Sequence, residues 1–395
     1  MILFNDKKDC CGCGACFQAC PKKAISFKTD ECGFKYPEIN DELCINCGLC
    51  KKVCAYQNII EKNTPQIVYA ATSNNDIQKK KSASGGIFAA IASYVIEKGG
   101  YVCGAAMLHN DNKFIIKHII IDNQDDLKLL QGSKYVQSDT GICFVKIKEL
   151  LNDGKLVLFS GTPCQCAGLK GYLRKDYENL WIADIICHGV PNAQFFNDYI
   201  NHLFGKLKNI SGFYFRDKTK GWELAGKIIY ENGSKVIYPP LSSYYSLFLK
   251  SHTYRINCYS CKYASEHRPG DITLGDYWGI QKEHPELLKS GKFSIKSGIS
   301  CIIVNSEKGK IIIDSVSDYL SLSKSTYEKV SRQNKQLTEP SKLHPMRNEV
   351  MTIYQTAGYK GVDELYKKTY KTQRAIQFVF CHLPYWLKTL IRKLK

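Results

Sequence analysis

Two segments near the N-terminus repeat one cysteine spacing that suits iron–sulfur chemistry. Residues 10–21 read CCGCGACFQACP and residues 44–55 read CINCGLCKKVCA, so the pattern CxxCxxCxxxC occurs twice. Three thiolates of such a loop can bind three corners of a 4Fe-4S cubane, while the fourth cysteine, which we expect at the entry to a helix, binds the neighbouring cluster. The spacing therefore predicts two clusters, the first bound by Cys10, Cys13, Cys16 and Cys54, and the second by Cys44, Cys47, Cys50 and Cys20.

Zinc knuckles are the alternative interpretation of this repeat, because zinc also binds four thiolates. Zinc sites usually combine two CxxC pairs, whereas this repeat has three closely spaced cysteines and a fourth beyond them. Two features depart from the ferredoxin pattern: Ala55 stands where proline usually follows the last cysteine, and Cys11 and Cys32 are surplus. We predict that Cys11 and Cys32 are non-ligands and that residues 1–60 resemble a two-cluster bacterial ferredoxin.

Length and composition limit the class of protein. The chain has 395 residues, 44% of them hydrophobic, which suggests two or three domains with their own cores and excludes a disordered chain. Ten of the 19 cysteines lie in the first 54 residues, and no apolar leader precedes them. No apolar run approaches the roughly 18 to 20 residues that span a bilayer. We therefore expect a cytoplasmic protein whose thiols are kept reduced for metal binding.

From about residue 65 the sequence alternates between helix and strand patterns. Ser84 can cap the first predicted helix, and Gly99 with Gly100 can end it. The alternation predicts an α/β core to about residue 205, followed by a more antiparallel section. We expect helices over 84–98, 142–154 and 165–175, and strands over 101–107, 114–122, 155–161, 180–187, 210–217, 226–233, 234–240, 271–279 and 299–304.

Four cysteines of this body could bind a third cubane. Cys164 and Cys187 each follow a buried strand, so both should reach the sheet edge at which open α/β sheets bind ligands. Cys258 and Cys261 add the CxxC pair of CYSCKY. Four thiolates would complete a third 4Fe-4S cluster, and the alternative is that they are buried free cysteines. We expect that alternative for the other body cysteines, including Cys166, which should lie inside a helix, and Cys103, Cys143, Cys301 and Cys381.

The loop SASGG (82–86) precedes the first predicted helix, where backbone N–H groups and glycines suit a phosphate. An ordinary helix cap explains the same residues better when they are taken alone. The sequence contains neither GxGxxG after a strand nor GxxxxGKS. A dinucleotide would therefore bind in a manner that is neither Rossmann nor Walker.

Six motifs in fixed order give the chain a family resemblance. KSASGG, QGSKYVQS, GTPCQCAGLK, CHGVP, CYSCKY and RPGDITLGDYWG follow the ferredoxin-type segment. Over about residues 1–330 this order resembles the beta-subunit family of coenzyme F(420) hydrogenases and dehydrogenases. The resemblance implies FAD bound without a Rossmann fingerprint, and at least one 4Fe-4S cluster in the body. It also implies electron relay to a two-electron organic acceptor such as a deazaflavin coenzyme, and it does not specify the substrate.

The resemblance also implies roles for particular residues. The FAD phosphates would be held by Ser82, Ser84, Gly85 and Gly86, and the flavin would lie near Ser133, Lys134, Tyr135, Thr162 and Pro163. Lys134 would stabilise the reduced ring, or else be a solvated loop cation. His188 would be a proton donor, or else only bond a strand end. Asp271, Asp276 and Trp278 would fix the loop around the cofactors, with Trp278 either shielding them or simply filling the interior.

Positive charge is concentrated at the C-terminus. The chain carries 55 Lys and Arg against 37 Asp and Glu, a net charge of +18, and residues 366–395 contain eight Lys or Arg and no acid. LPYWLKTLIRKLK (383–395) predicts a basic amphipathic helix that docks on an anionic membrane surface, on the body or on a partner enzyme. We do not expect nucleic-acid binding, because no recognition module is visible.

These observations predict an α+β or α/β protein with a two-cluster ferredoxin domain and a mixed α/β flavin-binding body. The predicted divisions are residues 1–60, 65–160, 161–335 and a basic helical tail at 336–395. The first functional hypothesis is an iron–sulfur flavoenzyme that exchanges electrons between a ferredoxin-type partner and an organic acceptor. The alternative is an electron-transfer subunit that serves a separate catalytic partner, for example one in surface-polysaccharide metabolism, without its own substrate site. A zinc-stabilised interaction protein is a third, remote interpretation.

Overall fold

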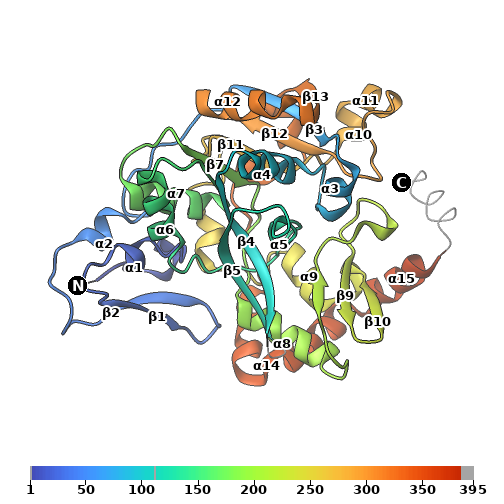
Figure 1. The fold of residues 1–395 in the computed structure, drawn as a ribbon. Coiled ribbons are helices and arrows are strands. Elements are labelled where there is room, and N and C mark those ends of the chain that lie inside the picture. Colours follow the sequence, from blue (N-terminus) through green and yellow to red (C-terminus); the bar gives the residue numbers. More distant parts are fainter. Residues whose placement is uncertain (1, 111–112, 384–395) are drawn as a thin grey trace.

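A computed structural model describes residues 2–110 and 113–383, and its centre is an eight-stranded sheet with helices on both faces (Figure 1). The strand order is β13-β3-β12-β11-β7-β6-β4-β5. Neighbours among β4, β6, β7 and β11 are parallel, and the other pairs are antiparallel. The strands are β3 (Ile67–Ser73), β4 (Tyr101–Asn110), β5 (Lys113–Ile121), β6 (Val157–Gly161), β7 (Leu180–Ile185), β11 (Ile272–Asp276), β12 (Ser300–Val304) and β13 (Leu320–Ser325).

Alternate residues of the central strands serve two helical layers. Leu158 of β6 shares a core with α4 (Ile87–Glu97) and α12 (Glu307–Ser315). Its neighbours Val157 and Phe159 share another core with α6 (Cys143–Asn152) and α7 (Pro163–Leu173). Strands buried on both faces read as continuous apolar runs, which is why β6 and β7 were predictable. The mixed α/β architecture expected from the sequence is confirmed.

The sheet joins the two parts into which the sequence divides the body. The predicted boundary between residues 160 and 161 falls inside β6, and the late strands β11 and β12 lie between β3 and β7. Residues 65–160 and 161–335 therefore share one sheet. Local sequence patterns could not reveal this, because they do not report which distant strands pair.

A second, antiparallel sheet has the order β10-β9-β8. Its core is rich in aromatic residues and includes Val350, Tyr354 and Val362 of α14. The part of the predicted tail that forms α14 is therefore packed into the body. These elements are β8 (Gly212–Tyr214), β9 (Gly226–Tyr230), β10 (Gly233–Ile237), α8 (Ala193–Phe204), α9 (Ser243–Leu249) and α14 (Arg347–Thr369).

The last described helix, α15 (Lys371–His382), has no buried residue. Its exposed apolar side chains include Ile376, Phe378 and Val379. The predicted amphipathic segment lies outside the described residues from Pro384 onward. Within the described ranges, no helix is long and apolar enough to cross a membrane.

The cysteine repeat folds around two glycines that precede short helices. Gly14 and Gly48 have φ angles of 83° and 72°, a left-handed conformation that glycine adopts without strain. Cys20 is the C-terminal cap of α1, so the expectation that it enters a helix is wrong. The elements are α1 (Ala15–Ala19), α2 (Leu49–Lys52) and the antiparallel pair β1 (Ile25–Thr29) and β2 (Lys35–Ile39).

The predicted cap of α4 is also wrong. Gly86, with a φ angle of 87°, is the residue before this helix, and no side chain caps it. Ser84 Oγ instead donates a hydrogen bond to the Ile299 carbonyl at 3.0 Å. The remaining helices are η1 (Lys7–Asp9), α3 (Asp76–Lys81), α5 (Leu127–Leu130), η2 (Lys218–Lys220), η3 (Pro239–Leu241), η4 (Ile256–Ser260), α10 (Ile280–Glu283), α11 (Pro285–Lys289), η5 (Ser317–Tyr319), α13 (Tyr327–Ser331) and η6 (Lys335–Leu337).

A buried ion pair fixes the carboxyl end of β7. The Arg268 guanidinium donates to Asp184 Oδ1 at 2.8 and 3.1 Å, and the two side chains are 1% and 0% exposed. Thr273 Oγ1 and the Gly270 N–H also donate to Asp184. Arg268 in turn donates to the Tyr263 carbonyl, which follows the CxxC segment. The pair thus connects the end of β7 to the segment that follows Cys261.

Replacing Asp184 with asparagine is expected to destabilise the protein by about 3–5 kcal/mol, because Arg268 would remain buried without a counter-charge. Urea denaturation of the full chain measures the loss. The control is Asp176→Asn, which breaks the pair with Lys308 at 3.2 Å, where the Asp176 side chain is 75% exposed. That substitution should change stability by less than about 1 kcal/mol. Similar losses in both variants would contradict the assignment.

Candidate functional site

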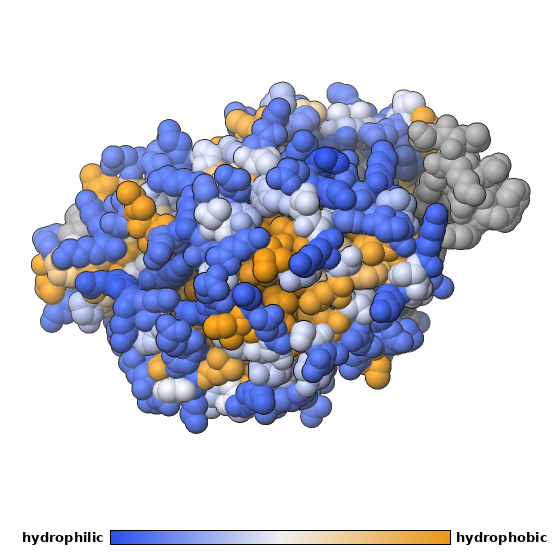
Figure 2. Space-filling model, turned by 90° about the horizontal axis from the view of Figure 1, so that it is seen from above, coloured by the Kyte–Doolittle hydropathy of each residue, from blue (hydrophilic) through white to orange (hydrophobic). Residues whose placement is uncertain are grey.

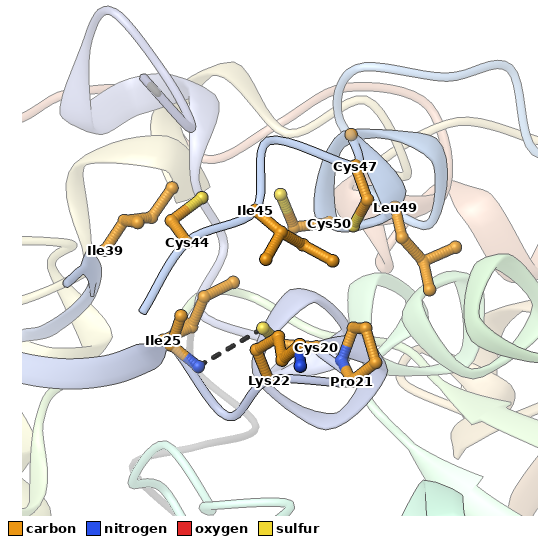
Figure 3. Close-up of a pocket in the computed structure, with 12 residues that line it drawn as sticks. Cys20, Pro21, Lys22, Ile25, Ile39, Cys44, Ile45, Cys47, Leu49 and Cys50 are labelled. Carbon is orange, nitrogen blue, oxygen red and sulfur yellow. Dashed lines mark hydrogen bonds between the residues drawn. The ribbon is translucent and has the colours of Figure 1, made fainter. Parts of the chain in front are cut away.

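The four cysteines predicted for the second cluster line one hollow at the surface of the ferredoxin-type segment. Cys20, Cys44, Cys47 and Cys50 surround a space of about 350 Å³, which includes its open mouth. In Figure 3 Cys20 lies on one side of this space, and the other three cysteines lie on the opposite side. Cys47 is exposed, whereas Cys50 is buried and burial raises the pKa of its thiol. This quartet therefore faces solvent.

The thiols predicted for the first cluster form a second quartet, deeper in the molecule. Burial raises the pKa of the Cys16 thiol, and negative charge on Cys13, Cys10 and Cys54 raises it further. The four sulfurs are therefore close enough to interact electrostatically. Cys13 is buried against α7, where a Cβ on Gly168 would lie 2.7 Å from its sulfur. This quartet lies at the junction with the body.

The structure also brings together the cysteines predicted for a third cluster. Burial raises the pKa of Cys187 to about 12, and charge on Cys164 and Cys261 contributes to the rise. Cys258 is influenced by the same three thiols. Cys164 and Cys187 follow the parallel neighbours β6 and β7, so the reasoning from strand ends places them correctly.

Cys11 lies between the first and third quartets, a position that its spacing did not reveal. Its thiol is hydrogen-bonded to both Cys13 and Cys164, and it is only 5% exposed. The hydrogen bond from Cys11 is the main reason why the pKa of Cys164 falls to about 7. One thiol therefore separates a predicted ligand of one cluster from a predicted ligand of the next.

The donor sets fit iron–sulfur clusters. Each quartet supplies four thiols, and a cubane spreads such ligands over four iron atoms rather than one. In the described part of the chain, no three His, Cys, Asp or Glu side chains have the geometry to share a single metal ion.

The loop predicted to hold the FAD phosphates is fixed to the start of β12. The Gly85 N–H donates to Ser300 Oγ at 2.9 Å, in addition to the bond from Ser84. A Cβ on Gly85 would lie 2.6 Å from the Ala71 carbonyl oxygen, so only glycine fits. Ser82 Oγ accepts a hydrogen bond from Gln131 Nε2, which joins this loop to the GSKY segment.

Lys218 crosses to the same loop and was not predicted. Its ammonium donates to the carbonyls of Ser84, of Lys79 at 2.8 Å and of Ser297 at 2.6 Å. Burial lowers the pKa of Lys218 to about 8. A cation thus lies beside the N-terminus of α4, where it adds positive charge to the helix end.

Arg216 forms the centre of a neighbouring group of side chains. It pairs with Asp276 at 2.8 Å and donates weakly to Tyr135 Oη at 3.4 Å. Trp222 also donates to Asp276, and its ring stacks on Trp278 with centroids 4.8 Å apart. One terminal nitrogen of the buried Arg216 has no hydrogen-bond partner among the described residues. Tyr135 was predicted near the flavin, and Asp276 and Trp278 were predicted to fix the loop around the cofactors, whereas Arg216 and Trp222 were missed.

Lys134 differs from both descriptions given for it. Its ammonium donates to the carbonyls of Leu129, Leu130 and Gln131 at 3.2, 2.8 and 2.9 Å, at the end of α5. Burial lowers its pKa to about 7. It is therefore neither a solvated loop cation nor free to turn toward a ligand without losing these bonds. Ser133 lies in the same loop.

His188 follows Cys187 and is an exposed residue. Partial desolvation of its imidazole by the surrounding protein lowers its pKa. The nearby Asp276 carboxylate opposes that shift. No hydrogen bond of its imidazole occurs among the described residues, so the ring does not bond a strand end. Its carbonyl accepts a bond from Ser341 Oγ.

Three other predicted residues have different surroundings. Thr162 caps α7, and its hydroxyl contacts the Cys164 sulfur at 3.2 Å. Pro163 is the buried first residue of that helix. Both therefore surround the third quartet. Asp271 accepts from the Ile182 N–H and from Ser306 Oγ, so it braces β7 against α12 rather than a cofactor loop.

The other body cysteines are mostly in the core, as expected. Cys103, Cys143, Cys166 and Cys301 are buried. Cys381 is the exception, because it is half-buried on α15 and not part of a core. The surplus Cys32 accepts a hydrogen bond from Gln355 Nε2 at 3.0 Å.

Comparison with known proteins identifies the family. Models described as "coenzyme F(420) hydrogenase/dehydrogenase, beta subunit" match residues 67–141 with their N-terminal part and 154–329 with their C-terminal part. A 4Fe-4S dicluster domain matches residues 9–58. The chain belongs to the beta-subunit family of coenzyme F(420) hydrogenases and dehydrogenases, whose members are oxidoreductase subunits, and it carries a 4Fe-4S dicluster domain.

Individual relatives are more distant. The coenzyme F(420)-dependent sulfite reductase of Methanocaldococcus jannaschii is 24% identical over 389 residues, which cover 92% of this chain and 55% of that protein. An uncharacterised ferredoxin of the same organism is 39% identical over 60 residues, which cover 15% of this chain and 77% of the ferredoxin. The chain spans about half the length of the longer curated relatives.

A chain of the F(420)-reducing NiFe hydrogenase complex from Methanosarcina barkeri aligns with a TM-score of 0.44 and 16% identity. The alignment covers 80% of this chain and 96% of that chain. At this distance the likeness carries no argument about the site.

Lys134→Met is expected to change how stability depends on pH. The pKa of Lys134 is about 7 in the folded protein against 10.5 as its ordinary value, so the unfolded chain binds more protons between these values. Its contribution therefore makes the free energy of unfolding rise with pH from about 7 to 10.5. The variant should lack this rise in denaturation curves at pH 7 and pH 9.5.

The matched control is Lys128→Met, because Lys128 is exposed on α5, the helix whose last carbonyls Lys134 contacts. This control should retain the pH dependence of the wild type. An unchanged pH dependence in Lys134→Met would show that Lys134 is charged in the folded protein at pH 9.5.

Proposed function

We propose that the protein is an iron–sulfur flavoprotein oxidoreductase. It would relay electrons between 4Fe-4S clusters and FAD, and on to a two-electron organic acceptor such as a deazaflavin coenzyme. The observation that carries the proposal is the convergence of the third cysteine quartet with the first, joined by Cys11. The family and the dicluster domain support the iron–sulfur part.

The three quartets are arranged in a way that suits stepwise electron transfer. Cys47 of the second quartet is exposed, the first quartet lies at the junction with the body, and the third lies inside it. A 4Fe-4S cluster exchanges single electrons and a flavin can exchange two, so together they couple a one-electron partner to a two-electron acceptor. The exposed end would meet a ferredoxin-type donor or acceptor.

The side chains around Arg216 and Lys218 support a flavin site in the body. An orphaned guanidinium nitrogen in a buried position would be satisfied by an acceptor atom of a bound group. Lys218 and the N–H groups at the start of α4 suit an anionic group at the Ser82–Gly86 loop. Trp222 and Trp278 exclude water from the region between them.

In this proposal the protein's residues bind, orient and supply protons. Ser84 and Lys218 hold the Ser82–Gly86 loop in place, and the unpartnered Arg216 nitrogen would donate a hydrogen bond to the bound flavin. Lys134 holds the end of α5, and hence the GSKY loop, in position. His188 is the exposed titratable side chain beside Cys187, and we assign it the role of proton donor to the acceptor.

The alternative is an electron-transfer subunit without its own substrate site, which would deliver electrons to a separate catalytic partner, for example one in surface-polysaccharide metabolism. Two surface features favour a bound partner. Figure 2 shows hydrophobic residues gathered across the middle of one face within a hydrophilic surrounding. The exposed apolar residues of α15, beside Lys371 and Arg374, would also suit docking on a partner or on a membrane surface. A cytoplasmic location would suit both functions.

Anaerobically purified protein is expected to contain about 12 iron atoms, a similar amount of acid-labile sulfide, and one FAD. Cys258→Ser should remove about four of the iron atoms, because it breaks the third quartet. Iron, sulfide and flavin analysis measures these contents. Cys32→Ser is the control, since Cys32 belongs to no quartet, and it should keep the wild-type iron content. About eight iron atoms in the wild type would exclude the third cluster, and an absence of flavin would contradict the flavoenzyme.

A second measurement separates the two functions. The purified protein, reduced chemically in the absence of any partner, should transfer two electrons to a deazaflavin or another small acceptor, followed by the absorbance of the acceptor. Cys258→Ser is expected to slow this turnover, because it breaks the third quartet, which in this proposal connects the first quartet to the flavin. If the wild type retains its iron and flavin but turns over no acceptor, the electron-transfer subunit is the correct description.

A further inference from the structure

Arg255 is a buried cation at the junction between the ferredoxin-type segment and the body. Its side chain is among the largest that are fully buried, at 1% exposure. The guanidinium donates to the Cys10 carbonyl at 2.8 Å and to the Lys35 carbonyl at 3.0 Å. It also stacks on the Tyr36 ring, 3.9 Å from the centroid. These contacts tie the loop before η4 to the N-terminal segment.

The same guanidinium interacts with thiols of two quartets. One terminal nitrogen lies 3.7 Å from Cys10 Sγ, within hydrogen-bond distance for sulfur. Its charge is also felt by Cys258 and by Cys164, and it lowers the pKa of Cys164. Arg255 therefore contacts a thiol of the first quartet and interacts electrostatically with two thiols of the third.

No carboxylate pairs with Arg255 within the described ranges. Its hydrogen-bond partners are carbonyl oxygens, the Gln137 side chain at 3.5 Å and the Cys10 sulfur. The other buried arginines near the site differ, because Arg268 pairs with Asp184 and Arg216 pairs with Asp276. A buried charge without a partner is strongly unfavourable, so the position requires negative charge from another source.

We propose that Arg255 sets the reduction potential of the cluster at Cys10, Cys13, Cys16 and Cys54, through its charge and a hydrogen bond to the Cys10 sulfur. The inference rests on the proposed function, because it presupposes that the clusters are present. A cubane with four thiolate ligands is an anion, and reduction adds one more negative charge. A nearby buried cation and an N–H to sulfur bond both stabilise the more negative state, which makes the cluster easier to reduce.

This placement gives Arg255 a role in the direction of electron flow. The second quartet lies at the surface, and Arg255 contacts none of its members. Arg255 raises the potential of the first cluster relative to the second, and so favours movement of an electron from the surface toward the body. Arg255 is a positioning residue in this sense, because it acts on the cluster through Cys10 and not on a substrate.

The test is an EPR-monitored redox titration of the full chain, purified anaerobically with its clusters. Arg255→Gln is expected to shift the midpoint potential of the first cluster to more negative values, and to leave that of the second unchanged. Arg255→Lys keeps the charge but cannot reach two carbonyls and the sulfur together, so it should give a smaller shift in the same direction. If the glutamine variant fails to retain iron, the lysine variant decides the question.

The matched control is Arg347→Gln. Arg347 is also buried and donates to the carbonyl of Tyr254, the residue before Arg255, but it contacts no thiol of the three quartets. The cluster midpoint potentials of this variant should equal those of the wild type. Equal midpoint potentials in wild type and Arg255 variants with equal iron content would overturn the inference. A wild type without iron would instead overturn the proposed function, so the two failures are distinguishable.

Discussion

The buried pair between Asp184 and Arg268 holds together two of the three segments that carry the third cysteine quartet. Asp184 is the penultimate residue of β7, just before the chain reaches Cys187. Arg268 follows the CxxC segment, and its remaining donors bind the carbonyls of Tyr263 and Ile185. With four hydrogen bonds arriving at the Asp184 carboxylate, neither segment can move without exposing a buried charge. The position of Cys187 relative to Cys258 and Cys261 depends on this restraint.

Hydrogen bonds and close packing also fix the ferredoxin-type segment to the body. Thr140 Oγ1 donates to the Cys13 carbonyl, and Gln137 Nε2 donates to the Cys11 carbonyl. On the opposite side of the junction, Gly171 in α7 allows the Val53 carbonyl to approach, since a Cβ there would lie 2.5 Å from it. The first quartet is therefore held against the body, and only the second remains at the surface. These contacts fix the orientation of the segment. The second quartet then lies at the surface and the first lies against the body.

The sequence alone predicted the parts of this arrangement that depend on local spacing. Cysteine repeats, buried apolar strands and the strand-end positions of Cys164 and Cys187 all follow from near neighbours in the chain. The predicted cap at Ser84 was wrong, because Gly86 in a left-handed conformation precedes α4, and Cys20 ends a short helix instead of entering one. Arg216, Lys218 and Arg255 were missed because no spacing rule marks a lone cation. Their importance appears only once distant segments pack around them.

Part of the positive charge that makes up the net +18 lies in the interior of the protein, which composition alone could not show. Arg255 has no carboxylate partner among the described residues, and burial lowers the pKa of both Lys134 and Lys218. Without bound groups, each of these positions opposes folding through the desolvation of a positive charge. Anionic clusters and a phosphate-bearing cofactor would offset that penalty, and any group that binds only the folded chain stabilises it. Folding and cofactor binding would therefore depend on one another, because both involve the same buried charges.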